Sequence, residues 1–209
     1  FIGGKKMSTK LPLLVKLLDS VSKICFGGGI ANTLLHAKGF SLGTSWVEYN
    51  CLSEARRFCE LAEKHDVELI LPCDAAVSDD LAGFSKKSFV PIDGVLPHEC
   101  VVDVGPKTIL LYEKWALQAS SVYWNGPMGI YEYRSGMQGS ARLASFLSSG
   151  DAYTLVGGGD TLSALELLGI DDFSHLSTGG GAFLHYLANN STPVLEAMGV
   201  KKEEMVEFA

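Results

Sequence analysis

Three glycine triplets are the residues of this sequence that most directly suggest a chemistry. They stand at 27–29, 157–159 and 179–181, and each follows a short apolar run and precedes a segment of helical periodicity. Glycine leaves backbone N–H groups unobstructed, and amides at a helix start, together with the helix dipole, attract anions such as phosphate. A single triplet is better explained as a tight turn, whereas three at one edge of one sheet favour phosphate binding.

A fourth turn adds positive charge to the same pattern. Gly3 and Gly4 open the sequence G-G-K-K-M-S-T-K, in which Lys6 and Lys10 are four residues apart and share a face of any helix that begins here. The helix dipole disfavours ammonium groups at a helix start unless a negative group is bound there. The turn is therefore either part of an anion site or a solvated basic loop.

Asp160 directly follows the second triplet. A carboxylate beside a phosphate cradle requires an intervening cation, and Mg²⁺ is the usual one. The same carboxylate also suits the N-cap of a helix beginning near Leu162. The two roles are compatible, and the sequence leaves both open.

The segment 124–132 combines apolar and polar groups in one loop. Its sequence, W-N-G-P-M-G-I-Y-E, follows the end of an apolar run. Such a loop can hold a purine between aliphatic surfaces while the Glu132 carboxylate takes the ribose hydroxyls. Considered alone, the segment is better explained as a Gly-Pro turn with a solvent-facing glutamate.

Several other chemistries lack their motifs. The sequence has no G-x-G-x-x-G dinucleotide motif, no G-x-x-x-x-G-K-[ST] P-loop and no G-x-S-x-G nucleophile elbow. Its five cysteines and five histidines show no metal-ligand spacing. A net charge of −7 without a basic stripe argues against nucleic acid or an anionic membrane as a partner. With no run of 18 apolar residues, the cytoplasm is the expected location.

Short apolar runs and helical segments alternate along the chain and must position these turns. Strands are expected near 23–26, 67–71, 101–104, 121–124, 153–156 and 175–176, and helices near 10–20, 52–65, 108–119, 140–147, 162–168 and 182–188. The prolines and the Asp-Gly pair within 85–100 indicate an excursion or small hairpin.

The alternation predicts the fold class and the edge at which ligands bind. At 209 residues the chain has room for one domain. A doubly wound, Rossmann-like α/β fold is expected, with a mostly parallel sheet of about six strands and helices on both faces. Ligands of such sheets bind at the carboxyl ends of the strands, which is where the glycine turns lie.

Together, six segments resemble landmarks of the phosphoglycerate kinase family, in the family's order. The landmarks are G-G-x-K-x-S-x-K, G-G-G-x-A-x-T, D-x-G-P-x-T, W-N-G-P-M-G-x-x-E, G-G-G-D-T and H-x-S-T-G-G-G-A. In this sequence they fall at 3–10, 27–33, 103–108, 124–132, 157–161 and 175–182. Six matches in the same order are not expected by chance, and they cover most of the chain.

The resemblance implies a two-domain phosphotransferase that moves a phosphoryl group between 1,3-bisphosphoglycerate and MgADP, giving 3-phosphoglycerate and MgATP. Every landmark belongs to the nucleotide-binding C-terminal domain, so residues 1–190 are expected to form this domain and 191–209 a tail that returns toward a missing N-terminal domain. Phe1 and Ile2 resemble the end of a strand, and the chain is expected to be cut there. Alone, it is expected to be a monomer that binds nucleotide without turnover.

The resemblance also assigns roles to individual residues. Asp160 is the expected Mg²⁺-linked carboxylate. The residues expected to act on the transferred phosphoryl group are Lys6, Gly158, Gly159, Thr178, Gly180 and Gly181. The residues expected to contact the nucleotide are Gly3, Gly4, Lys6, Lys10, Gly28, Gly29, Asn125, Pro127, Gly129, Ile130, Glu132, Gly157, Gly158, Gly159, Asp160 and Thr161.

The lysine turn departs from the family pattern at two positions. The family usually has alanine where this sequence has Lys5 and aspartate where it has Thr9, so one ammonium is gained and one carboxylate is lost. Because Thr9 has no carboxylate, it cannot take over any role that the family's aspartate has in closing the site or placing the cation. A second hypothesis is therefore a free-standing adenine-nucleotide-binding module without transferase activity. A nicotinamide-binding oxidoreductase shares the fold class but lacks its fingerprint.

Overall fold

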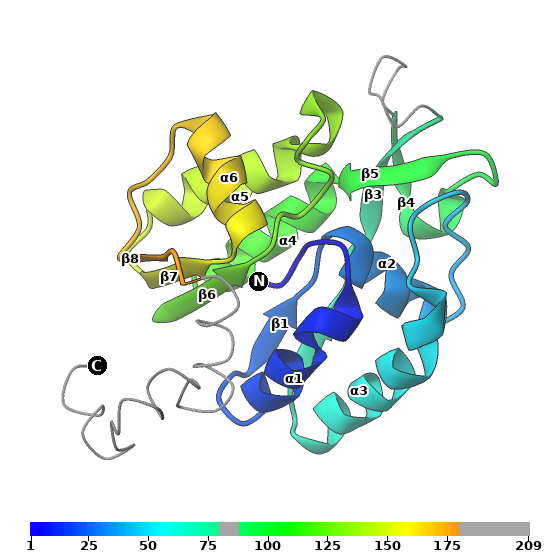
Figure 1. Cartoon of the computed structure of the whole chain (residues 1–209), viewed down its shortest axis with the longest axis horizontal. Coiled ribbons are helices and arrows are strands. Elements are labelled where there is room, and N and C mark those ends of the chain that lie inside the picture. The colour runs from blue at the N-terminus through cyan, green and yellow to red at the C-terminus, as the bar shows by residue number, and fades with distance from the viewer. Residues whose placement is uncertain (80–87, 180–209) are drawn as a thin grey trace.

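A parallel sheet forms the centre of the molecule (Figure 1). The structure is a computed structural model that describes residues 1–79 and 88–179. Two groups of parallel strands are joined by the first residues of the chain, because Ile2 bridges both Phe26 and Asn125. The strand order is therefore β2 (Glu68–Ile70), β1 (Lys23–Cys25), residues 1–3, β6 (Ser121–Asn125), β7 (Tyr153–Gly157) and β8 (His175–Ser177).

The first residues join the two halves by hydrogen bonds on both of their edges. On one side the Ile2 N–H donates to the Cys25 carbonyl at 2.8 Å, and the Gly27 N–H donates to the Ile2 carbonyl at 2.9 Å. On the other side the Gly3 N–H donates to the Asn125 carbonyl at 2.9 Å. The expected strand end at the start of the chain is confirmed, as is the α/β fold with about six parallel strands.

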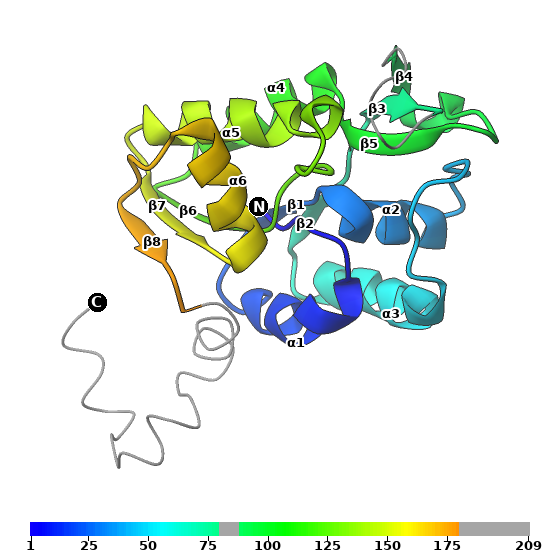
Figure 2. The same ribbon diagram turned by 45° about the horizontal axis from the view of Figure 1, so that its top comes forward.

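Helices cover both faces of the sheet, as Figure 2 shows. One hydrophobic cluster lies under α1 (Met7–Leu17), α2 (Gly28–Ala37) and α3 (Leu52–Lys64), and another lies under α4 (Pro106–Ala116), α5 (Gln138–Ser148) and α6 (Gly159–Leu168). Successive strand residues point to opposite faces, so Ile24 and Phe26 join the first cluster and Cys25 the second. Across the described ranges, every helix is too short or too polar to cross a membrane.

A small antiparallel sheet extends from one end of the molecule. Its central strand, β3 (Asp74–Ser78), pairs with β4 (Ser88–Pro91) on one side and with β5 (Cys100–Val104) on the other. The predicted strand at 101–104 therefore exists but lies outside the parallel sheet, and β3 was not predicted. The excursion expected within 85–100 is confirmed as part of this antiparallel sheet.

The remaining elements follow the predicted pattern with shifted ends. Short 3-10 turns lie at Tyr49–Cys51, Ile92–Gly94 and Arg134–Gly136. The helix expected at 10–20 begins at Met7 and contains Pro12 in its interior, while the helix expected at 162–168 begins at Gly159. The helix expected at 182–188, the proposed boundary at 190, and Gly180 and Gly181 lie outside the described residues.

Two helices have their first N–H groups satisfied by carboxylates from strands of the antiparallel sheet. Asp74, which is 4% exposed, accepts hydrogen bonds from the Lys107 N–H at 3.0 Å and the Thr108 N–H at 2.8 Å at the start of α4. Asp103 accepts the Gly139 N–H at 2.7 Å at the start of α5. These N–H groups have no acceptor within their own helices, so each carboxylate stabilises a helix start and fixes it to a strand.

Asp74→Asn is expected to destabilise the fold by about 1–3 kcal/mol, because charge-assisted bonds to α4 are lost while the site stays buried. The Thr108 hydroxyl, which donates to the Asp74 carboxylate at 2.6 Å, loses its charged acceptor as well. Urea unfolding measures the change. The exposed Asp151→Asn variant is the matched control and should unfold like the unaltered chain. Equal stability of the two variants would contradict the assigned role of Asp74.

Candidate functional site

Four turns meet at the carboxyl edge of the parallel sheet and are held together by hydrogen bonds. The Gly4 N–H donates to the Pro127 carbonyl at 2.9 Å, and the Gly28 N–H donates to the Met128 carbonyl at 2.8 Å. The Asn125 side-chain amide donates to the Gly157 carbonyl at 2.9 Å. The lysine turn, the first two glycine triplets and the 124–132 loop thus form one continuous surface.

Two of the glycines are required by the closeness of these turns. A Cβ atom on Gly3 would collide with the Pro127 carbonyl oxygen. Gly28 has a φ of +59°, and a Cβ there would lie 2.8 Å from the Gly4 carbonyl oxygen. Backbone therefore packs on backbone, which only glycine permits at these two positions.

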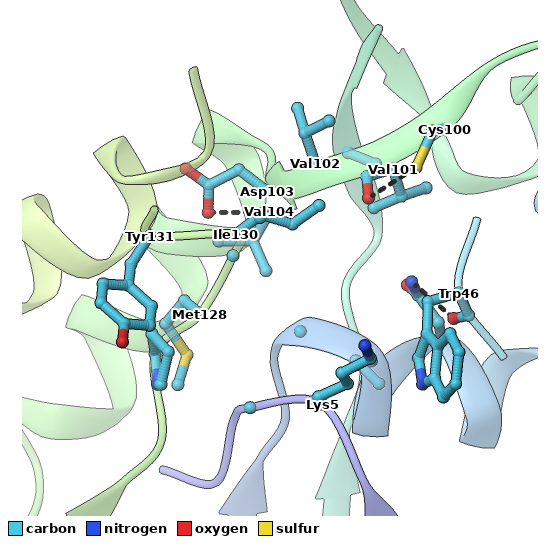
Figure 3. Close-up of a pocket in the computed structure, with 18 of the residues that line it drawn as sticks. Lys5, Trp46, Cys100, Val101, Val102, Asp103, Val104, Met128, Ile130 and Tyr131 are labelled. Atoms are coloured by element: carbon cyan, nitrogen blue, oxygen red, sulfur yellow. Dashed lines mark hydrogen bonds between the residues drawn. The ribbon is translucent and has the colours of Figure 1, made fainter. Parts of the chain in front are cut away.

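A cavity of about 370 Å³ opens above this surface (Figure 3). Side chains of β5, among them Val102 and Val104, form an apolar wall opposite the lysine turn. The residues expected to contact a nucleotide that line the cavity are Gly4, Gly28, Gly29, Pro127, Gly129, Ile130, Glu132 and Asp160. The cavity is apolar along one wall and carries carboxylates at one end, which suits a ligand with an apolar ring and a charged group.

The starts of α2 and α6 are rich in glycine and adjoin the cavity, and their N-cap residues, like that of α4, are glycines. The residues that cap α2 and α6 are Gly27 and Gly158, which have no side chain to accept a hydrogen bond. Asp160 is not the N-cap considered from the sequence, because α6 begins one residue before it. Its exposed carboxylate instead lines the cavity at the first turn of the helix.

The lysines of the first turn occupy three different environments. Lys10 donates from its ammonium to the Gly3 carbonyl at 2.8 Å and the Asn125 carbonyl at 3.0 Å, beneath the surface of the turns. Burial lowers the pKa of Lys10 to about 8, and the Asp160 carboxylate acts in the opposite direction. Lys6 is exposed and Lys5 lines the cavity. Lys6 and Lys10 therefore do not form the paired cationic face that their spacing suggested.

A carboxylate of the protein itself stands at the start of this helix. Glu48, which is 6% exposed, accepts hydrogen bonds from the Ser8 N–H at 3.0 Å and from the Ser8 hydroxyl. The segment before α3 therefore supplies a negative group at the helix start, where the sequence left open either a bound anion or a solvated basic loop. It stabilises the start of α1 and fixes the lysine turn to the rest of the domain.

Several expected contact residues lie behind the cavity and hold its floor. Thr161 is fully buried, and its hydroxyl accepts the Gly126 N–H at 2.6 Å and donates to the Gly157 carbonyl at 2.9 Å. Asn125 is also buried and bonds to the same carbonyl. The expected residues that do not line the cavity, among those described, are Gly3, Lys6, Lys10, Asn125, Gly157, Gly158, Gly159, Thr161 and Thr178.

Asp160 is suited to a magnesium ion that is shared with a ligand. In the part of the chain that the structure describes, no group of three or more His, Cys, Asp or Glu side chains is arranged to hold a metal alone. Mg²⁺ commonly keeps several waters and binds one or two carboxylates together with substrate phosphates. An exposed carboxylate at the first turn of α6 fits that mode of binding.

Some lining residues were not predicted from the sequence. Trp46 and Asn32 line the cavity, and the Asn32 amide donates to the Trp46 carbonyl at 3.2 Å. The polar pair at 32–33 on the otherwise apolar helix α2 was a signal, since Thr33 also accepts the Glu48 N–H at 3.1 Å. Trp46 follows a turn at Gly43 that carries no glycine triplet, and its backbone is held by the bond from Asn32.

Comparison with known proteins identifies the family. The family model for phosphoglycerate kinase matches residues 1–190. The chain belongs to the phosphoglycerate kinase family. The resemblance drawn from six landmarks is thereby confirmed.

Similar phosphoglycerate kinases come from diverse organisms. That of Coxiella burnetii is 42% identical over 204 residues, which make up 97% of this chain and 52% of that protein. That of Desulfovibrio desulfuricans is 40% identical over 198 residues, or 94% of this chain and 51% of that protein. The chain spans about half the length of the curated relatives it matches.

Solved phosphoglycerate kinases share the fold of this chain. The structure from Coxiella burnetii has a TM-score of 0.90 at 42% identity and covers 97% of this chain and 52% of that chain. The structure from Pyrococcus horikoshii has a TM-score of 0.82 at 27% identity and covers 97% of this chain and 51% of that chain. The α/β architecture is therefore that of known members of the family.

Lys10 is expected to make the stability of this phosphoglycerate kinase chain depend on pH. Its pKa is about 8 when folded and 10.5 as a free lysine, so the unfolded state binds more protons between these values. The free energy of unfolding should therefore rise from pH 8 toward pH 10, relative to a Lys10→Met variant that cannot titrate there. Urea unfolding at intervals between pH 7 and 10 measures this difference. A difference that stays constant over the range would contradict the burial of the ammonium.

Proposed function

We propose that this chain is the nucleotide-binding half of a phosphoglycerate kinase and binds MgADP and MgATP. The observation that carries the proposal is the cavity formed where the glycine-rich turns meet, with Asp160 at the first turn of α6. An apolar slot beside a helix start and a carboxylate provides the three elements that a magnesium nucleotide requires. Family membership and the six landmarks support the same assignment.

The nucleotide would lie along the cavity with its base against the apolar wall. Gly28, Gly29 and Ile130 bound that part, and Glu132 would take the ribose hydroxyls. The phosphates would face the start of α6, where Asp160 holds Mg²⁺. Backbone N–H groups of a glycine-rich helix start would there neutralise phosphate charge without a side chain in the way.

The charged and glycine residues around the phosphates would position the transferred group. Lys6, at the solvent-exposed start of α1, would neutralise phosphate charge from outside the cavity, and Lys10 would do so from beneath the turns. Thr178, Gly180 and Gly181 complete the proposed set for the phosphoryl group. Phosphoryl transfer depends mainly on such positioning and charge neutralisation, and it requires no covalent intermediate with the protein.

The whole reaction would require a second half of the enzyme. We assign residues 1–190 to the nucleotide domain and 191–209 to a tail that returns toward the N-terminal domain, which would hold 1,3-bisphosphoglycerate or 3-phosphoglycerate. The chain's length, about half that of its relatives, is consistent with this division. The isolated chain would be a cytoplasmic monomer that binds nucleotide without transferring a phosphoryl group.

Titration calorimetry with ADP tests the binding proposal. The chain is expected to bind ADP saturably and more tightly with magnesium, and not to bind NAD. Asp160→Asn should remove most of the magnesium-dependent gain, roughly tenfold in affinity or about 1.4 kcal/mol. Asp171→Asn, an exposed carboxylate in the loop after α6, is the matched control and should retain the gain. Folded chain without ADP binding, or an unchanged magnesium effect in Asp160→Asn, would contradict the proposal.

An assay of phosphoryl transfer tests the division of labour between the halves. With MgATP and 3-phosphoglycerate, the isolated chain is expected to form ADP no faster than a blank without protein, because the proposed acceptor site is on the other half. An intact phosphoglycerate kinase measured under the same conditions is the positive control. Turnover by this chain alone would show that the acceptor binds here as well.

A further inference from the structure

The two ends of the cavity differ in chemistry. Figure 3 shows Tyr131 on one side and Trp46 with Cys100 on the other. Burial raises the pKa of Tyr131, and the carboxylates of Asp160 and Glu132 raise it further, which marks its side as the acidic end. The opposite end, defined by Trp46, Cys100 and Val101, is lined mainly by apolar groups.

One ammonium group stands at the apolar end. The Lys5 Nζ lies 4.4 Å from the centroid of the Trp46 ring, and Figure 3 shows the side chain directed toward that ring rather than toward Tyr131. This distance is typical of a cation–π interaction, which holds an exposed lysine in place by about 0.5–1 kcal/mol. Lys5 therefore points away from the side of the cavity on which Tyr131 lies.

The position of Trp46 is itself constrained by the backbone around it. A Cβ on Gly29 would lie 2.7 Å from the Trp46 Cδ1 and 2.5 Å from the Lys5 carbonyl oxygen, so the ring, the lysine turn and the start of α2 pack closely. The Asn32 amide fixes the Trp46 backbone by its 3.2 Å bond. The ring nevertheless remains 44% exposed and lines the cavity.

We propose that Lys5 and Trp46 form the base-selecting end of the cavity and favour a 6-oxopurine nucleotide over a 6-aminopurine nucleotide. The inference rests on the proposed nucleotide binding and specifies the class of base. In that frame the phosphates would lie near Asp160, and the base would extend along the same cavity to the end where Lys5 and Trp46 meet. Trp46 supplies a flat apolar ring, and Lys5 supplies a charged donor that lies over the face of that ring.

The preference follows from the donors and acceptors of each base. A lysine ammonium carries three donors and no acceptor. The edge of guanine or hypoxanthine that carries N7 and O6 presents two acceptors, whereas the same edge of adenine presents the N7 acceptor and an amino donor. An ammonium facing this edge gains a hydrogen bond to O6 and meets an unfavourable donor with adenine. Lys5 thus discriminates between bases at a position where a short apolar residue would not.

Calorimetric titration of the chain with ADP, GDP and IDP, each with magnesium, tests the proposal. Lys5→Met keeps the length of the side chain and removes its donors, and it should lower the affinity for GDP relative to ADP by roughly threefold to tenfold. IDP, which has O6 but no 2-amino group, should follow GDP. Lys64→Met, at the exposed end of α3, is the matched control and should leave the ratios unchanged.

The outcomes separate this inference from the proposed function. An unchanged ratio in Lys5→Met, with all three nucleotides still bound, overturns base selection and leaves nucleotide binding intact. An equal loss of affinity for ADP and GDP places Lys5 on the phosphates and also overturns base selection. A folded chain that binds none of the three overturns the proposed function, and the inference with it. Trp46→Leu gives a second reading, since loss of the ring should shift the ratio in the same direction as Lys5→Met.

Discussion

The hydrogen bonds of residues 1–3 are the interaction on which the rest of the structure depends. These residues lie between β1 and β6 and join the pair β1 and β2 to the three strands β6, β7 and β8, which otherwise have no ladder in common with that pair. The same backbone continues directly into Gly4. The register with which residues 1–3 pair with β1 and β6 therefore also sets the position of the lysine turn at the edge of the sheet. The Gly4 and Gly28 N–H bonds to the 124–132 loop then follow from that register. The pairing of residues 1–3 with the sheet therefore also constrains the shape of the cavity.

A division among the helix starts follows from this arrangement. Buried carboxylates on β3 and β5 satisfy α4 and α5, and Glu48 satisfies α1, so these starts are closed and structural. The starts of α2 and α6 adjoin the cavity, but they differ from each other. In α2 the Gly28 and Ile30 N–H groups donate to the Met128 and Gly4 carbonyls, whereas α6 begins after Gly158 without a side-chain cap. Carboxylates of the chain therefore stabilise the starts of α1, α4 and α5, backbone carbonyls stabilise that of α2, and the first turn of α6 carries Asp160 at the cavity. The position of a helix start at the sheet edge, rather than the sequence of the helix alone, decides whether that start adjoins the cavity.

Local patterns predicted the fold and the location of the cavity, because glycine triplets and apolar runs act over a few residues. They predicted the five strand segments of the parallel sheet beyond the first residues, and most helices within a few positions. They missed β3, whose small residues are buried by strands on both sides. They also missed Trp46 and the enclosure of Lys10, because both depend on residues distant in sequence, namely Asn32 for the tryptophan and Asn125 for the lysine. The spacing of residues along the chain predicts which side chains share a face of a helix. It does not predict which distant carbonyl groups will accept hydrogen bonds from a lysine ammonium.

The lysine turn shows why adding charge to a loop does not simply add charge to a site. Lys10 is occupied by two carbonyls beneath the floor, and Lys5 is drawn toward Trp46. The Thr9 hydroxyl, which replaces the usual carboxylate, donates to the Lys6 carbonyl at 3.0 Å and so acts within the first turn of α1. The extra ammonium and the lost carboxylate therefore act at different ends of the turn. Their effects on an anion bound in the cavity depend on their distances from that anion as well as on their signs, because the Coulomb energy falls as the separation grows.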